Sequence, residues 1–358
     1  MPSLKEIKGR INSISSTLAI TSAMKMVAAA KLQKAQMAIQ NMLPYERRLH
    51  SMLIDLMGAM NISAAASEDG SVRGSGSAER GFDQSGDRLS LSNRHDLAGM
   101  DGAYSLMAQR EVRKVAIVAF ASNSSLCGAF NSNVIREATA VINEYRALGL
   151  GDADITVYSV GRKMAETMKK LGFPSPADFT KMSDSPSYEA ASALAQELLD
   201  GFVSGRFDKV ELVYNHYKST SSQPTIRQTY LPLSLADATA DIQVGKITDS
   251  ASESDTNRGA EPVGAPVVRQ GSPTTEDLIV EPSKEALIAT LLPKVIRLRI
   301  FTTLLDSAAA EHAARTVAMQ LATDNGNDLL QELTLEYNKG RQQKITSEIL
   351  DLVGGSLQ

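Results

Sequence analysis

The sequence predicts an α/β fold in which an antiparallel coiled coil of the N- and C-terminal helices accompanies a Rossmann-like α/β domain. Apolar residues recur at alternating steps of three and four at both ends of the chain, as in coiled coils. The middle instead alternates strand-like and helix-like segments, which indicates an α/β layer structure. With 358 residues, 43% of them hydrophobic, the chain can bury a sizeable core.

The N-terminal long helix is predicted over residues 1–63. Its apolar seam runs from Leu4 to Met60, and only Thr21, Lys25 and Glu46 interrupt it. The seam predicts a rod roughly 85 Å long at 1.5 Å per residue, whereas a compact 150-residue domain is only about 40 Å across. Pro44 is expected to kink this helix because proline removes a backbone hydrogen bond.

The C-terminal long helix is predicted over residues 278–358. Its seam runs from Leu291 to Tyr337 and then continues in four-residue steps from Arg341. Each long seam needs a partner, and the simplest partner is the other long helix. An antiparallel pair fits a chain whose middle folds separately.

The α/β domain is predicted over residues 104–236, with a mainly parallel sheet. The expected strands span 114–120, 155–160, 209–216 and 225–231, and the expected helices span 132–148, 162–171 and 187–203.

Two polar stretches, 64–103 and 237–277, are predicted to be flexible insertions because they hold few large apolar residues. The second holds eight acidic and three basic residues, a net charge of −5. This acidic stretch either contacts a basic surface of a partner or is a tolerated loop.

Composition excludes several function classes. A net charge of −4 argues against a protein built mainly to bind nucleic acid, and no apolar run approaches the ~20 residues that span a bilayer. A single cysteine excludes an internal disulfide. Residues 1–50 nevertheless hold eight basic and two acidic residues, so this helix either has a solvated face or meets acidic partners.

Cys127 is the one candidate nucleophile, because it lies between a predicted strand and a predicted helix. It would need a base, and the four histidines are scattered along the chain. The sequence favours a small packing residue beside a Gly128 turn, and it favours packing for His312 on the C-terminal seam. No phosphate-binding glycine motif occurs, so no catalytic residue, cofactor or metal is expected.

Long motifs at both ends resemble the gamma subunit of F-type ATP synthases. Residues 4–14 and 20–31 (LKEIKGRINSI and ITSAMKMVAAAK) resemble its N-terminal helix, and residues 311–327 and 336–349 resemble its C-terminal helix. Residues 125–131 (SLCGAFN) match more loosely. The family's preceding Ser-Asp-Arg-Gly is Ser-Asn-Ser-Ser here, so a charged pair is lost and a polar role for that turn is left open.

The resemblance implies a rotor without an active site of its own. Its shaft of two helices would turn inside the alpha/beta hexamer, and its foot domain would sit with the epsilon subunit on the membrane c-ring. Ring rotation driven by protons or another ion would thereby be coupled to ATP synthesis or hydrolysis. We expect a peripheral location on the cytoplasmic face of a bacterial inner membrane, because no transit peptide pattern precedes the shaft helix.

Four residues match partner-contacting positions of the family. Met24 and Lys25 match positions that face an acidic lever segment of beta. Arg341 and Gln342 match a pair that hydrogen-bonds a beta loop near the top of the shaft.

The alternative function is a static coiled-coil scaffold carrying an α/β domain. A permanent interface is usually anchored by aromatic residues, yet residues 1–60 contain only Tyr45, and residues 291–358 only Phe301 and Tyr337. This scarcity favours a surface that turns against its partners.

Overall fold

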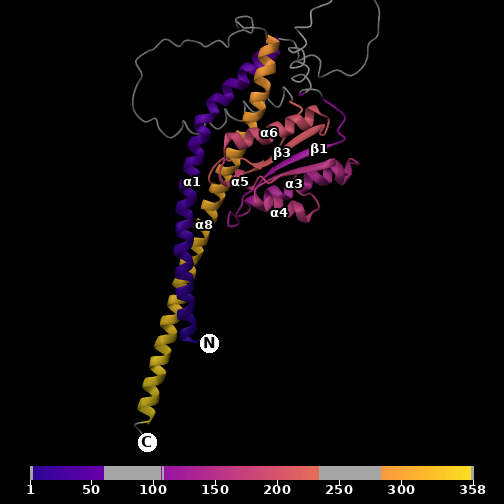
Figure 1. Cartoon of the computed structure of the whole chain (residues 1–358). Helices are drawn as coiled ribbons and strands as arrows, with labels where there is room; N and C mark the ends of the chain where they lie inside the picture. The colour runs from indigo at the N-terminus through magenta and orange to yellow at the C-terminus, as the bar shows by residue number, and fades with distance from the viewer. Residues whose placement is uncertain (1–2, 60–105, 107–108, 234–283, 356–358) are drawn as a thin grey trace, which may run out of the picture.

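The structure is a computed structural model that describes residues 3–59, 106, 109–233 and 284–355. The two expected insertions, 64–103 and 237–277, lie outside these residues. Figure 1 shows two long helices side by side, with an α/β domain packed against one side of the pair.

Helix α1 spans Leu4–Ala59 and helix α8 spans Lys284–Gly355, with 56 and 72 residues. At 1.5 Å per residue they are roughly 84 and 108 Å long. Both termini lie at the same end of the rod, and α8 extends beyond the start of α1 (Figure 1). The predicted antiparallel pair is therefore confirmed, and these two helices are called the shaft below.

Contacts between α1 and α8 fix their register. Leu18 packs so closely on Gly326 that a Cβ there would lie 2.6 Å from Leu18 Cδ2. Further along, a Cβ on Gly340 would lie 3.2 Å from Leu4 Cδ2. The residue number falls on one helix as it rises on the other, as antiparallel packing requires.

The seam predicted for α1 is its inner face, because every seam residue from Leu4 to Leu56 is buried or half-buried. Two of the three polar interruptions are paired with α8. Thr21 Oγ1 lies 3.0 Å from Thr323 Oγ1, and Glu46 accepts a hydrogen bond of 3.0 Å from Thr302 Oγ1. Side-chain hydrogen bonds thus replace apolar contacts at these levels of the coil.

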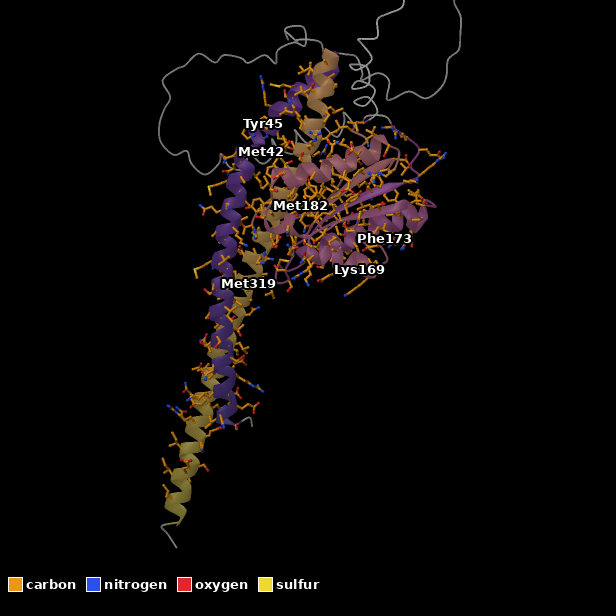
Figure 2. All side chains as sticks on the ribbon, in the orientation of Figure 1. Met42, Tyr45, Lys169, Phe173, Met182 and Met319 are labelled. Carbon is orange, nitrogen blue, oxygen red and sulfur yellow. The ribbon has the colours of Figure 1, made fainter. Side chains whose placement is uncertain are left out.

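Pro44 lies inside α1, which continues on both sides of it. Figure 2 labels Met42 and Tyr45 at the point where α1 changes direction. The bend agrees with the predicted kink, because proline cannot donate the backbone hydrogen bond of a straight helix.

The α/β domain contains a four-stranded sheet in the order β2-β1-β3-β4. The central strand β1 (Val115–Phe120) pairs in parallel with β2 (Ile155–Val160) and β3 (Lys209–Asn215). Strand β4 (Thr225–Leu231) is antiparallel to β3. The mainly parallel sheet is confirmed, and the predicted bounds of β2 and β4 agree with the structure.

Three predicted helices are present as α3 (Phe130–Ala147), α4 (Arg162–Lys170) and α6 (Tyr188–Val203). Ser187, predicted as the first residue of α6, is instead its N-cap and accepts a hydrogen bond from the backbone N–H of Ala190. A 3₁₀ turn (Asp152–Asp154) and the short helix α5 (Thr180–Asp184) were not predicted.

The two faces of the sheet are covered differently. Helices α3 and α4 cover one face, where residues such as Ile117 and Val141 are buried. Helix α6, helix α8 and the end of α1 cover the other face, where Phe120, Leu53 and Leu292 share one core. Helix α8 is therefore part of both the shaft and the core of the α/β domain.

Two glycines of the shaft have different surroundings, so substitutions at them are expected to have opposite effects on stability. Gly326→Val would force its side chain against Leu18, so we expect a loss of roughly 1–3 kcal/mol in the free energy of unfolding. The exposed Gly9 has no atom within 4 Å of its Cβ position. Gly9→Ala is expected to add about 0.5–1 kcal/mol through helix propensity. Denaturant unfolding of the purified chain measures both, and a Gly326→Val chain as stable as the parent would contradict this register.

Candidate functional site

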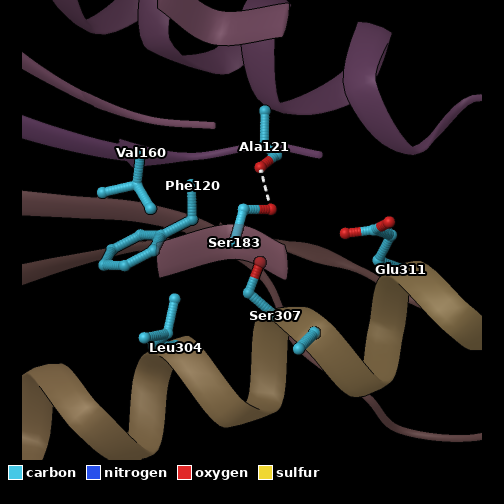
Figure 3. A pocket seen from close by; sticks show the side chains of 8 residues that line it. Phe120, Ala121, Val160, Ser183, Leu304, Ser307 and Glu311 are labelled. Carbon is cyan, nitrogen blue, oxygen red and sulfur yellow. Dashed lines mark hydrogen bonds between the residues drawn. The ribbon is translucent and has the colours of Figure 1, made fainter. Parts of the chain in front are cut away.

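The carboxyl edge of the sheet is where open α/β folds usually bind ligands, at the point where the strand order reverses. In this chain that point lies between β1 and β3, and α8 occupies it. Beside it, at the ends of β1 and β2, Phe120, Val160, Ser183 of α5 and Ser307 of α8 line a cavity of only about 10 Å³ (Figure 3). Such a space holds one water molecule at most. This edge of the domain therefore binds the shaft.

The turn between β3 and β4 contacts both shaft helices. His216 Nδ1 lies 2.7 Å from Asp306 Oδ2, and the backbone N–H of Tyr217 donates to Asp306 Oδ1 at 2.9 Å. The Tyr217 hydroxyl accepts a hydrogen bond of 2.7 Å from Gln36 of α1. The hydrogen bond with Asp306 raises the pKa of His216 above its usual 6.5, although burial and Lys218 act the other way.

The loop after β1 contacts α8 further along the shaft. Arg315 donates one hydrogen bond of 2.7 Å to Ser124 Oγ and another of 2.7 Å to Glu311 Oε1. Burial raises the pKa of Glu311, against the effect of the Arg315 charge.

Asn123, in the same loop, holds α4 and α5 in place. It donates to the Thr180 carbonyl at 2.7 Å and accepts from the Arg162 backbone N–H at 2.7 Å. The polar contacts of this loop are thus made by its Asn and Ser side chains, in place of the charged pair of the family motif.

Cys127 is 1% exposed and packs with Phe130 and Ala310. Its Sγ accepts a hydrogen bond of 3.2 Å from Asn131 Nδ2. This burial fits the packing role and does not present the thiol to a substrate. Within the described ranges, no three His, Cys, Asp or Glu side chains are grouped to hold a metal ion.

His312 is half-buried on the seam of α8. Burial, together with the nearby charges of Arg315 and Lys31, lowers the pKa of His312 to about 4. The ring is therefore neutral at physiological pH, as a packed polar residue would be.

The four predicted partner-contact residues lie on the shaft at two separate levels. Met24 is 40% exposed on α1, and Arg341 and Gln342 are exposed on α8 just past Gly340. Since Gly340 packs on Leu4, the two levels are about 20 residues of α1 apart, or roughly 30 Å. Lys25 is half-buried, because it lies on the inner seam.

An exposed apolar stripe flanks Met24 and was not predicted. Ile20 and Val27 are 59% and 58% exposed, and helical spacing places them on the same face as Met24. On α8, Leu321 is 57% exposed. The signal was present in the sequence, because these α1 residues are apolar yet lie off the seam.

A family model described as ATP synthase matches residues 3–357, almost the whole chain. The ATP synthase gamma chain of Phocaeicola vulgatus is 46% identical over 357 residues, covering 100% of both chains. That of Bacteroides thetaiotaomicron is 45% identical over 358 residues, again covering 100% of both. The chain belongs to the ATP synthase gamma family. The static scaffold alternative is accordingly not favoured for this gamma-type subunit.

The fold of this gamma-family chain is also found in a solved structure. A chain of the Euglena gracilis mitochondrial ATP synthase, OSCP/F1/c-ring in rotational state 3, superimposes with a TM-score of 0.51 at 18% identity. The match covers 98% of this chain and 92% of that one. None of the helices in the described part of the chain is long and apolar enough to cross a membrane.

The His216–Asp306 pair predicts a pH-dependent stability of this gamma-type subunit. Because the pKa of His216 is raised in the folded state, its stabilisation is fully present below the unfolded pKa and is lost as pH rises through the folded pKa. Asp306→Asn is therefore expected to cost roughly 1.5–3 kcal/mol at about pH 6 and distinctly less at about pH 9.

Unfolding of both chains at the two pH values measures this difference. Glu6→Gln is the matched control, because its pair with Arg10 is exposed and is worth less than about 1 kcal/mol at either pH. An Asp306→Asn cost that is equal at both pH values would contradict a charged His216.

Proposed function

We propose that this gamma-type subunit is the central rotor shaft that couples ion-driven ring rotation to ATP synthesis or hydrolysis. One observation carries the proposal: the α1–α8 rod continues well past the α/β domain and ends in an unpaired length of α8 (Figure 1). From residue 341 to residue 350 every α8 side chain is exposed, Ile345 and Ile349 included. Exposed apolar residues on an unpaired helix end support the proposal that partner subunits surround this end.

The shaft would act on its partners by shape and charge. The alpha/beta hexamer would surround it, and the exposed stripe of Ile20, Met24 and Val27 would meet the acidic lever segment of beta. Residues 1–50 carry a net charge of +6, which complements an acidic surface. Turning an asymmetric rod would favour a different conformation in each beta subunit in succession, provided that its contacts differ between those conformations.

Lys25 is proposed to add its charge at the same level, despite its half-buried position. A long lysine side chain can keep its ammonium group in water while its methylene groups are covered.

Arg341 and Gln342 are proposed to contact a beta loop at the far end of the shaft. Both are exposed, so they are available to a partner. The planar Arg341 guanidinium can bind a carboxylate with two parallel hydrogen bonds.

The α/β domain is proposed to be the foot that meets the epsilon subunit and the c-ring. The subunit would then lie on the cytoplasmic face of a bacterial inner membrane without entering it. The bacterial gamma chains that it resembles support this placement.

Co-expression with alpha and beta subunits tests the rotor function. We expect a hexamer that hydrolyses ATP steadily only when this chain is present. A chain that purifies separately, or that binds without changing turnover, would contradict the proposal.

Arg341→Lys tests the contact at the far end. A lysine keeps the charge but loses the second hydrogen bond, so we expect a contact weaker by roughly 1.5 kcal/mol. In inverted vesicles, fewer ions should be pumped for each ATP hydrolysed.

The control is Lys344→Arg on the same helix, where the Lys344–Glu348 pair is exposed. It should leave the pumping ratio unchanged. If Arg341→Lys also leaves ATP synthesis and the pumping ratio unchanged, Arg341 does not make this contact.

A further inference from the structure

The β3–β4 turn is bound to both shaft helices through four residues, Asp306, His216, Tyr217 and Gln36. We propose that these four residues form a torque-bearing junction, which makes the shaft and the α/β domain turn as one body. The proposal rests on the rotor function, since only a turning subunit must carry torque between these two parts.

The apolar packing at this level is poorly suited to resist rotation of α8 about its own axis. Leu304 and Leu305 are the last large apolar residues of α8 that are buried before the turn, and the buried apolar residues that follow Asp306 there are small, namely Ala308, Ala309, Ala310 and Ala313. Alanine methyl groups give this part of the α8 surface little relief, and dispersion contacts have little directional preference. Next to the turn, directional contacts made away from the helix axis therefore add resistance to twist that the small side chains do not supply, beyond the apolar core that α8 shares with the sheet nearer its start.

Asp306 supplies such a contact. Its two carboxylate oxygens take separate partners, the His216 ring at 2.7 Å and the Tyr217 backbone N–H at 2.9 Å. Both partners belong to the turn that directly follows β3. The Asp306 carboxylate is therefore bound to residues that the sheet positions. Two bonds to one planar group fix its orientation as well as its position.

Tyr217 extends the junction to the second helix. It packs against the buried cluster of Leu32, Ala309 and Ala313 and against the cluster of Cys127, Phe130 and Ala310. Its hydroxyl accepts the 2.7 Å hydrogen bond from Gln36 on α1. One residue of the domain thus contacts α1, α8 and the loop after β1.

A second contact supports the junction further along α8. Arg315 donates to Ser124 at 2.7 Å, nine residues past Asp306, or roughly 13 Å along the helix. Two ties at separate heights oppose tilting of the rod as well as twisting. Both ties lie at the carboxyl edge of the sheet, where α8 occupies the usual ligand crevice.

The junction can be tested by attaching a bead to the α/β domain of the subunit in a surface-fixed alpha/beta hexamer. Lys169→Cys provides an exposed attachment point on α4, away from the shaft (Figure 2), while Cys127 is buried. With rotation arrested by nucleotide, the angular variance of the bead reports the torsional stiffness between domain and shaft.

The test variant combines Tyr217→Phe with Asp306→Asn, which removes the Gln36 bond and the charge of the His216 pair while nearly keeping the shape. We expect its angular variance to rise roughly twofold, because directional ties are lost while packing is retained. ATP turnover without load should stay close to that of the parent. The matched control is Glu166→Gln, whose ion pairs lie within α4 and do not touch the shaft; its variance should not change.

An unchanged variance in a double variant that assembles and turns over would overturn the junction. Should the double variant not assemble, Tyr217→Phe alone removes a single oxygen and decides the question in the same way. Failure of the rotor function itself looks different, because the bead on the otherwise unaltered chain would then not rotate with ATP at all.

Discussion

The pairing of α8 with α1 is the interaction on which the rest of the structure depends. A helix of 72 residues gains little stability from its own hydrogen bonds and needs a packed face along its length. Helix α8 has two such faces where it passes the domain. One packs on the seam of α1, and the other closes the sheet, where Ile296 and Ile300 are fully buried. The rod and the domain therefore share one helix, and neither can move far without disturbing the other's core.

Because α8 belongs to both the rod and the domain, it also occupies the edge of the sheet where related folds bind a ligand. In related architectures the carboxyl ends of the strands leave a crevice for a small molecule. Here α8 fills that region: Asp306 pairs with the turn after β3 and Arg315 with the loop after β1, while Glu311 accepts a hydrogen bond from Arg315 within the helix. Polar groups that could serve catalysis elsewhere hold a helix in this chain. Exposed apolar residues also lie along the shaft, among them Ile20, Val27 and Leu352.

The elements whose apolar residues recur at a regular spacing could be predicted from the sequence. The seam of α1 and the strands β2 and β4 were predicted because apolar spacing records which face is buried. The short α5 was not predicted, since five residues are too few to show a helical period. The contact of Tyr217 with Asp306 could not be predicted either, because the two residues are 89 positions apart. The half-buried position of Lys25 could not be predicted for the same reason: its surroundings depend on where α8 lies.

The rotor function requires the two shaft helices to turn as one unit in a fixed antiparallel register. A disulfide between Thr21→Cys and Thr323→Cys would lock this register, because the two hydroxyl oxygens lie 3.0 Å apart and a disulfide could replace their contact. We expect the disulfide to form readily and the crosslinked subunit to support ATP-driven ion pumping as well as the reduced one. Failure to crosslink, or pumping that is lost on crosslinking and restored by a reductant, would contradict it.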